Sequence, residues 1–246
     1  MHTLITGAAS GIGKATALRL SKRSAISIAD RNIDGAKEVA AEIIRNGGKA
    51  QALAVDVVDP QSVKTMVLKA QEGLGPIDAL FNNAGINIRT PVLDISEDEW
   101  DLVLNTHARG MFLVAQNVLR GMVDRKHGVI VNTSSDFAVM GVPNFASYCA
   151  AKTAIYSLTK CLALEFAAHG IRVNAIGPGP IDTPILRQNR RPEDIDIALK
   201  ANAERAPMKR LGKPEEVAAV IDFLMSDRAS YINGQLIQPN GGCVIW

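Results

Sequence analysis

The sequence has few cysteines and histidines, and neither set has the spacing of a metal site. Three cysteines, Cys149, Cys161 and Cys243, are an odd and scattered set that does not frame disulfides. The four histidines never occur three or four residues apart, so no metal site is expected. Cys149 and Cys161 fall in an alanine-rich helical pattern, and we expect both to be small buried side chains.

Long apolar runs and an excess of one charge are also lacking. No run approaches the ~18 residues that a membrane span needs, and the first residues have neither the basic nor the apolar region of an export signal. The formal net charge of +2 gives no reason to expect nucleic acid or a membrane as a partner. We therefore expect a cytoplasmic protein that acts on a small molecule. With 246 residues, 47% of them hydrophobic, the chain can bury the core of one α/β domain.

A glycine-rich turn lies near the start of the chain. The short apolar run Thr3 to Thr6 meets Gly7, Gly11 and Gly13, and a helical pattern follows. Gly7 is expected to make the turn, Gly11 to let the backbone approach a pyrophosphate, and Gly13 to let the helix pack on the strand. Glycines also close ordinary hairpins, so the turn alone is a weak signal. An NTPase phosphate loop is excluded, because Ala15 stands where that loop has Ser or Thr.

An acidic residue strengthens the case for a dinucleotide. The second apolar run, Ala25 to Ala29, ends in Asp30, about 20 residues beyond the turn, where a ribose-binding acid belongs. The sequence thus favours a strand, turn and helix that hold a dinucleotide.

Strand and helix patterns alternate along the rest of the chain. This alternation predicts a doubly wound parallel sheet with helices on both faces, in a single domain over residues 1–246. Strands are expected over 50–55, 77–81, 128–132, 171–176 and 234–238, and helices over 34–46, 60–72, 96–125, 146–169 and 214–226. Residues 183–207 carry several Arg and Pro around short helical patterns, and we expect them to form a mobile lid over the ligand site.

Tyr148 and Lys152 lie four residues apart in a predicted helix and so share one face. A cation beside a tyrosine stabilises the phenolate and lowers the pKa of the hydroxyl, which makes it a usable base. Most such pairs merely lie on a solvated helix face. Ser135, however, follows the preceding strand at the same edge of the sheet and could hold a substrate oxygen beside the tyrosine. The set suggests hydride transfer.

Six motifs in order resemble those of the short-chain dehydrogenase/reductase family, and the likeness covers nearly the whole chain. They are Thr6-Gly7-x-x-x-Gly11-Ile12-Gly13, Asn82-Asn83-Ala84-Gly85, Asn105, Ser135, Tyr148-x-x-x-Lys152 and Pro178-Gly179. The resemblance implies a seven-stranded Rossmann fold with Tyr148 as the acid/base. It further implies that Lys152 binds the nicotinamide ribose and lowers the pKa of Tyr148, that Ser135 orients the substrate oxygen, and that Asn105 holds a water in a proton relay.

The resemblance also implies the cofactor site and its specificity. The cofactor-binding residues would be Gly7, Ser10, Gly11, Ile12, Gly13, Asp30, Asp56, Val57, Asn83, Ala84, Gly85, Tyr148, Lys152, Pro178, Gly179, Ile181 and Thr183. The Asp30 carboxylate would bind the adenosine ribose of NAD and repel a 2'-phosphate. Arg31 could bind that phosphate in principle, but Ser10 is uncharged. NAD is favoured over NADP.

The substrate is less defined, and a small to medium secondary alcohol or ketone fits best. Candidate contacts are Asn87, Phe137, Asn144, Phe145, Leu186 and Arg187. Arg187, Arg190 and Arg191 raise the hypothesis of an anionic substrate, although a solvated surface is the simpler interpretation. A 3-oxoacyl carrier-protein reductase and a dinucleotide-binding regulator on the same fold are the alternatives. The resemblance implies a homotetramer, and the apolar tail Cys243 to Trp246 gives weak support.

Overall fold

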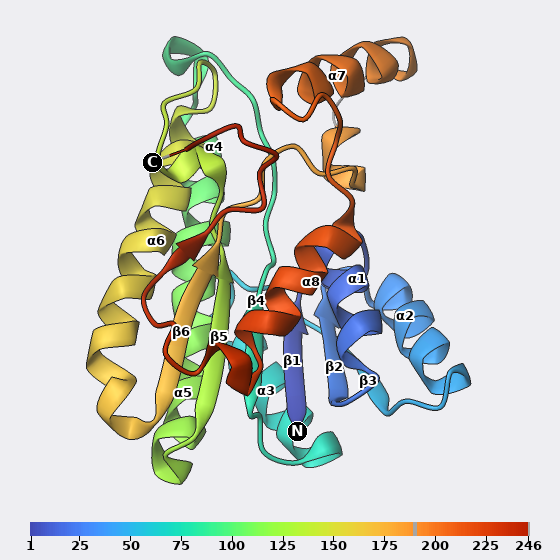
Figure 1. Ribbon diagram of the computed structural model, residues 1–246, viewed down its shortest axis with the longest axis vertical. Helices are drawn as coiled ribbons and strands as arrows, with labels where there is room; N and C mark the ends of the chain where they lie inside the picture. Colours follow the sequence, from blue (N-terminus) through green and yellow to red (C-terminus); the bar gives the residue numbers. More distant parts are fainter. Residues whose placement is uncertain (189–190, 246) are drawn as a thin grey trace.

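Figure 1 shows the computed structural model, which describes residues 1–188 and 191–245. A parallel sheet of seven strands, in the order β3-β2-β1-β4-β5-β6-β7, forms the middle layer. The strands are β1 (His2–Thr6), β2 (Ala25–Asp30), β3 (Ala50–Ala54), β4 (Ala79–Asn82), β5 (Gly128–Thr133), β6 (Ile171–Ile176) and β7 (Leu236–Ile237). The order reverses between β1 and β4, and a doubly wound sheet binds its ligand beside such a reversal, outside the carboxyl ends of the strands.

Helices cover both faces of the sheet, which confirms the predicted doubly wound fold. Helices α1 (Gly11–Leu20), α2 (Ile33–Arg45) and α8 (Pro214–Leu224) pack into one apolar core. Helices α3 (Pro60–Leu74), α5 (Gly110–Arg125) and α6 (Ala146–Phe166) pack into the other. The central strands are buried on both faces, which explains their continuous apolar runs.

Local sequence signals set most of the helix boundaries. Asp59 caps α3 through the amide of Gln61, at 2.9 Å, and Pro60 occupies the first helical position. Gly170, with φ of +69°, ends the turn after α6. The predicted strand boundaries hold to within about two residues, as helix and strand ends usually do.

The helix predicted over 96–125 is interrupted. It consists of α4 (Glu97–Leu104) and α5, joined by a π-helical turn over Asn105–Arg109. Such a turn inserts an extra residue and changes which side chains face inward. A second expectation is wrong: Cys161 is exposed on α6 instead of buried, while Cys149 is half-buried.

The described part of the lid segment contains regular structure. It contains a short 3-10 turn, Pro184–Leu186, and the helix α7 (Pro192–Arg205). In Figure 1, α7 lies beyond the carboxyl ends of the strands, above α8 in this view. Arg190 and Trp246, which the sequence analysis named for the anion hypothesis and for the apolar tail, lie outside the described residues.

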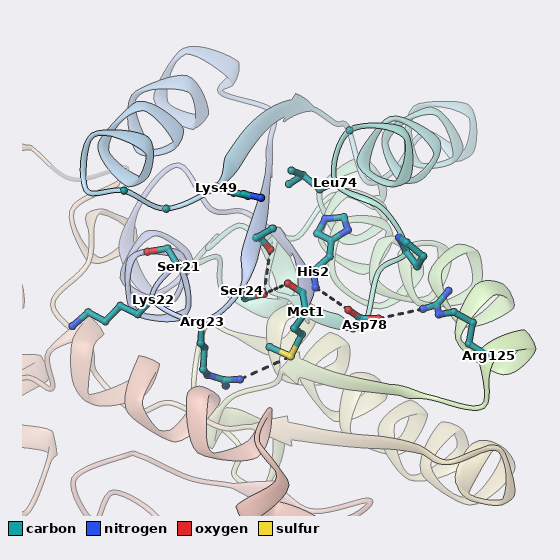
Figure 2. A pocket seen from close by; sticks show the side chains of 15 residues that line it. Met1, His2, Ser21, Lys22, Arg23, Ser24, Lys49, Leu74, Asp78 and Arg125 are labelled. Atoms are coloured by element: carbon teal, nitrogen blue, oxygen red, sulfur yellow. Dashed lines mark hydrogen bonds and ion pairs between the residues drawn. The ribbon is translucent and has the colours of Figure 1, made fainter.

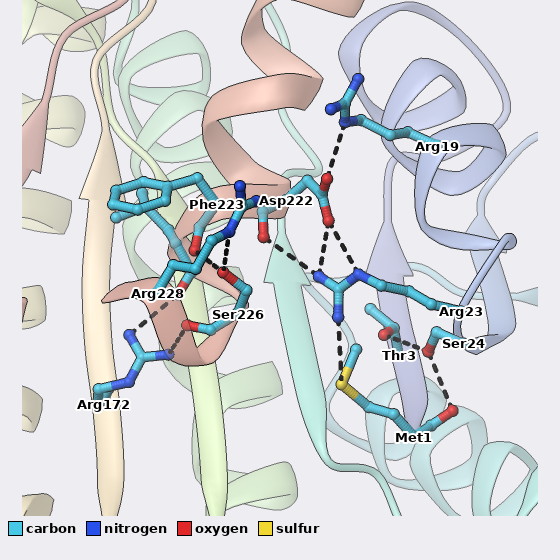
Figure 3. Close-up of polar contacts among 11 residues, drawn as sticks. Met1, Thr3, Arg19, Arg23, Ser24, Arg172, Asp222, Phe223, Ser226 and Arg228 are labelled. Carbon is cyan, nitrogen blue, oxygen red and sulfur yellow. Dashed lines mark hydrogen bonds and ion pairs between the residues drawn. The ribbon is translucent and has the colours of Figure 1, made fainter. Parts of the chain in front are cut away.

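Charged side chains join α8, near the end of the chain, to α1 and the segment that follows it. Asp222 of α8 pairs with Arg19 of α1, at 3.0 Å, and with Arg23, at 2.7 Å (Figure 3). These contacts hold the pKa of the Asp222 carboxyl below its usual value. Within residues 1–188 and 191–245, no helix combines the length and the apolar character that crossing a membrane requires.

Candidate active site

A cavity of about 680 Å³ opens at the carboxyl ends of the strands. It brings together nearly all of the residues expected to bind a cofactor. Its lining includes Gly7, Ser10, Gly11, Ile12, Asp30, Asp56, Val57, Asn83, Ala84, Gly85, Tyr148, Lys152, Pro178, Gly179, Ile181 and Thr183. Gly13 is expected in this set but does not line the cavity. A Cβ at this position would clash with the Gly7 carbonyl, so Gly13 serves the close packing of helix on strand.

The glycine turn fits a bound pyrophosphate. Gly7 and Gly11 have φ values of +65° and +54°, a conformation that suits glycine. A Cβ on Gly7 would lie 2.8 Å from the Cα of Ala84, so any side chain here would collide with the end of β4. No side chain caps the N-terminus of α1, and Gly11 and Ile12 line the cavity. The turn and the helix N-terminus therefore form a cradle for an anion.

Hydrogen bonds fix the floor of this cradle. The Thr6 hydroxyl accepts from the amides of Asn83, at 2.9 Å, and Ala84, at 3.1 Å. The Asn83 side chain donates to the Gly7 carbonyl at 3.1 Å and accepts from the Thr133 hydroxyl at 3.1 Å. These bonds tie the ends of β1, β4 and β5 together, which places the glycine turn relative to the catalytic candidates.

Asp30 lies at the end of β2, beside the turn. Its carboxylate oxygens accept from the amide of Ala9 and from the amide of Asn32, each at 2.9 Å. These bonds orient the carboxylate, and Asp30 lines the cavity together with Arg31. A ribose and a carboxylate could therefore meet here.

Ser135, Tyr148 and Lys152 meet on one wall of the cavity. Ser135 follows β5, and its hydroxyl accepts from the amide of Phe137 at 3.1 Å and donates to the Asp136 carboxylate at 3.0 Å. Tyr148 and Lys152 lie one turn apart on α6, and the lysine Nζ is 5.4 Å from the centroid of the tyrosine ring. Lys152 is 2% exposed and donates to the Thr133 carbonyl at 2.8 Å.

The ionisation of this pair differs from the expectation. Burial raises the pKa of Tyr148 above its usual value, and only its hydrogen bond with Ser135 acts in the opposite direction. Burial also lowers the pKa of Lys152 to about 7. In the protein without a cofactor, burial therefore outweighs the effect that Lys152 is expected to have on the pKa of Tyr148. Activation of the tyrosine needs a further positive charge.

His107 lies where the relay residue was expected. Asn105 is not among the residues that line the cavity, whereas His107, two positions later in the π turn, is. The correction follows from that turn, which rotates His107 inward. Its Nε2 lies 2.8 Å from the Ile86 carbonyl, and its ring meets the Tyr148 ring edge-on at 5.3 Å. Burial, followed by the charge of Lys152, lowers the pKa of His107 well below its usual value, so the imidazole is neutral.

The substrate candidates are partly brought together. Asn87, Phe137, Phe145 and Leu186 line the cavity, but Asn144 and Arg187 do not. Asn144 instead has a φ of +68° and accepts from the Thr90 amide through its carbonyl. Its role is thus in the loop backbone.

Two of the three lid arginines that raised the anion hypothesis are held by acidic neighbours, and the third, Arg190, lies outside the described residues. Arg187 pairs with Asp182 at 2.6 Å, and Arg191 pairs with Asp194 at 2.8 Å. Sequence reasoning missed Arg205, the last residue of α7, which lines the cavity and pairs with Asp136 at 3.1 Å. No local pattern marks it, because its partner lies in a distant segment.

A second hollow, of about 760 Å³, lies at the amino ends of the strands (Figure 2). Around it, the backbone amide of His2 donates to Asp78 at 2.9 Å, and Arg125 lies 3.8 Å from the same carboxylate. It contains none of the predicted site residues. Doubly wound sheets bind ligands at the opposite edge, so this hollow is not the candidate site.

The fold and this site define a class of oxidoreductases that bind a nicotinamide dinucleotide on a doubly wound sheet. The comparisons with known proteins agree, since a family described as enoyl-(acyl carrier protein) reductase matches residues 7–244. The chain belongs to the short-chain dehydrogenase/reductase family.

Relatives of the chain carry out different reactions within this class. The chain is 41% identical to the 3-oxoacyl-(acyl-carrier-protein) reductase of Thermotoga maritima, over 98% of this chain and 97% of that protein. It is 38% identical to the levodione reductase of Leifsonia aquatica, over 97% of this chain and 92% of that protein. A crystal structure of levodione reductase superimposes with a TM-score of 0.93 and 36% identity, over 98% of this chain and 96% of that one.

Proposed function

We propose that the protein is an NAD-dependent oxidoreductase that interconverts a secondary alcohol and a ketone. The observation that carries the proposal is the meeting of Ser135, Tyr148 and Lys152 on the wall of the cavity that also holds the glycine turn and Asp30. A binding module would not need an acid/base group beside its cofactor site.

Each residue of the wall has a role in this reaction. When bound, the cofactor supplies or accepts the hydride at the substrate carbon. Tyr148 takes the hydroxyl proton during oxidation and returns it during reduction. Ser135 orients the substrate oxygen by exchanging its hydrogen bond to Asp136 for one to that oxygen. Lys152, which donates to the Thr133 carbonyl, would bind the nicotinamide ribose and, when protonated, favour the phenolate.

Tyr148 needs a positive charge nearby to act as a base. The protein alone raises the pKa of this hydroxyl through burial. Lys152 and the glycine turn would hold the dinucleotide, and its oxidised ring would supply a positive charge, absent from the reduced ring, that favours the phenolate of Tyr148. Tyr148 would then be a base in the complex that oxidises the alcohol.

Asp30 supports the choice of NAD. Two backbone amides fix the carboxylate at the end of β2, where a 2'-phosphate would meet its negative charge. Arg31 also lines the cavity, and it would favour NADP only if it outweighed this repulsion.

The alternative is a 3-oxoacyl carrier-protein reductase, which the likeness to the Thermotoga protein supports. Asp30 speaks against it to the extent that such enzymes use a phosphorylated cofactor. The two functions differ in substrate, so an acetoacetyl thioester and simple ketones distinguish them.

The test is the absorbance of the reduced nicotinamide with purified protein, NAD and NADP in parallel, and a panel of secondary alcohols, ketones and an acetoacetyl thioester. We expect turnover with NAD by one group of alcohols. Tyr148→Phe should lower it about 10²- to 10⁴-fold, the usual contribution of acid/base catalysis, while NADH fluorescence shows unchanged cofactor binding. Full activity in this variant would refute the role of Tyr148. Tight NAD binding without any turnover would favour a regulatory protein.

We also propose a homotetramer that pairs through the helices on one face. Leu164 of α6 is 83% exposed, and Phe112 of α5 is also exposed. Apolar groups on neighbouring helices favour association. Light scattering after size exclusion tests the proposal, and a monomer at micromolar concentration would refute it.

A further inference from the structure

Helix α7 carries a guanidinium group into the cavity, directly above the catalytic wall. Arg205 is the last residue of this helix, and its guanidinium carbon lies 4.8 Å from the centroid of the Phe137 ring. Its Nη2 lies 3.1 Å from Oδ2 of Asp136. Asp136 and Phe137 follow Ser135 in the chain, so the end of the lid is fixed over the residue that orients the reacting oxygen.

Two N–H donors of this guanidinium are left without acceptors. Nε and Nη1 of Arg205 are buried, and neither has a hydrogen-bond partner in the part of the chain that the structure describes. Asp136 is 2% exposed, and its Oδ2 takes part in the ion pair but in no hydrogen bond with any described residue. Buried donors are costly unless an acceptor meets them. The cavity at this point therefore suits an oxygen atom of a ligand.

The charge of the pair decides which kind of oxygen fits. Arg205 and Asp136 carry opposite charges at short distance, so together they are neutral. A carboxylate in contact with Arg205 would add a second negative charge close to the Asp136 carboxylate, with which Arg205 is already paired. A carbonyl or hydroxyl oxygen accepts from Nε or Nη1 without this repulsion.

The surroundings limit the size and polarity of the ligand. Phe137, Phe145 and Leu186 line the same cavity and offer apolar surface to a ligand. The rings of Phe137 and Phe145 meet at 5.3 Å, and Phe137 lies 6.0 Å from the Tyr148 ring. An apolar ring or short chain fits between the two polar ends.

We propose that Arg205, oriented by Asp136, binds a second and uncharged oxygen of the substrate. The preferred substrates are then small ketones or secondary alcohols that bear another carbonyl or hydroxyl group. The inference rests on the proposed function, because Tyr148 and Ser135 define the position of the first oxygen. The Ser135 hydroxyl and Arg205 bind the two oxygens of the same Asp136 carboxylate, which places both substrate oxygens on one side of the cavity.

The experiment compares three probes of similar shape in NADH-dependent reduction: cyclohexanone, 1,4-cyclohexanedione and 4-oxocyclohexanecarboxylate. For the native protein we expect kcat/KM for the dione to exceed that for cyclohexanone about 10- to 100-fold, the usual effect of a hydrogen bond that a site is built to make. Arg205→Met should remove this preference, so that the ratio of kcat/KM for the dione to kcat/KM for cyclohexanone falls to about one. Arg205→Lys keeps the charge but lacks the two donors, and it should also lose the preference.

Arg187→Met is the matched control, since Arg187 is another lid arginine but pairs with Asp182 and does not line the cavity. It should retain the full preference. A preference for the dione that persists in both Arg205 variants would overturn the inference. A native preference for the carboxylate over the dione would overturn the argument from charge and with it the proposed ligand.

Failure of the proposed function gives a different result. If the native protein reduces none of the three probes, the proposed function fails for this substrate class. Calorimetric titration of 1,4-cyclohexanedione into the NADH complex of Tyr148→Phe then decides the inference. Saturable binding that is lost on adding Arg205→Met supports it, whereas absent or unchanged binding overturns it.

Discussion

Lys152 is expected to destabilise the folded protein in the absence of cofactor, and the structure gives the size of this effect. Burial lowers the pKa of its ammonium group from 10.5 to about 7. At about 1.4 kcal/mol for each pH unit, this difference corresponds to roughly 5 kcal/mol that the folded state pays for the charged lysine. The hydrogen bond from Lys152 to the Thr133 carbonyl offsets about 1 kcal/mol of this cost, so the net cost of burying the charged lysine is smaller than this figure.

The sign of the pH dependence follows from proton binding. Above pH 7 the folded state releases the proton of Lys152, whereas the unfolded chain holds it up to about pH 10. The unfolded state therefore binds more protons between these values, and the stability rises with pH across this range. Below about pH 7 the lysine is charged in both states, and the full cost of burial is present.

Lys152→Met removes the charge and keeps the length of the side chain. We expect the variant to be more stable than the native protein by about 2 to 4 kcal/mol near pH 6, and of about equal stability near pH 10, where the remaining cost of burial and the lost hydrogen bond each amount to about 1 kcal/mol. Urea unfolding at both pH values, without cofactor, measures the difference. Lys160→Met, which replaces an exposed lysine of the same helix, is the control. A stability difference that is the same at both pH values would refute the reasoning.

Two further predictions concern specificity and the wall of the cavity. Asp30→Ser removes the charge that would repel a 2'-phosphate and leaves the cation of Arg31. The ratio of kcat/KM for NADP to kcat/KM for NAD should therefore rise about 10- to 100-fold. An unchanged ratio would contradict the role of Asp30. His107→Leu leaves the Ile86 carbonyl without its partner and should lower the free energy of unfolding by about 1 to 3 kcal/mol, whereas His107→Asn can restore the bond and recover most of the loss. Equal stability of the two His107 variants in urea unfolding would show that this bond does not matter.

The structure also shows why some sequence predictions succeeded. The glycine turn is a local property, because the positive φ values of Gly7 and Gly11 depend only on these residues being glycine. Tyr148 and Lys152 share a helix face because four residues make about one turn. Such features depend on neighbours in the sequence. The order of the motifs along the chain is then enough to predict the family.

Two features of the site that the sequence did not reveal depend on the folded backbone. The helical period places Asn105 on a continuous helix, but the π turn over Asn105–Arg109 shifts the register, and His107 reaches the cavity instead. The lowered pKa of Lys152 likewise comes from burial, which no local pattern specifies.

By itself, the sequence determined the alternation of strands and helices, the glycine turn, the acid at the end of β2 and the spacing of the tyrosine and lysine. Each of these features depends on residues that are close together in the sequence. The tertiary structure alone decided which side chains face one another across the cavity. Arg205 and Asp136 belong to different segments and meet only because α7 folds back over the end of β5. The substrate contacts depend on such meetings, which is why the reaction class can be predicted earlier than the substrate.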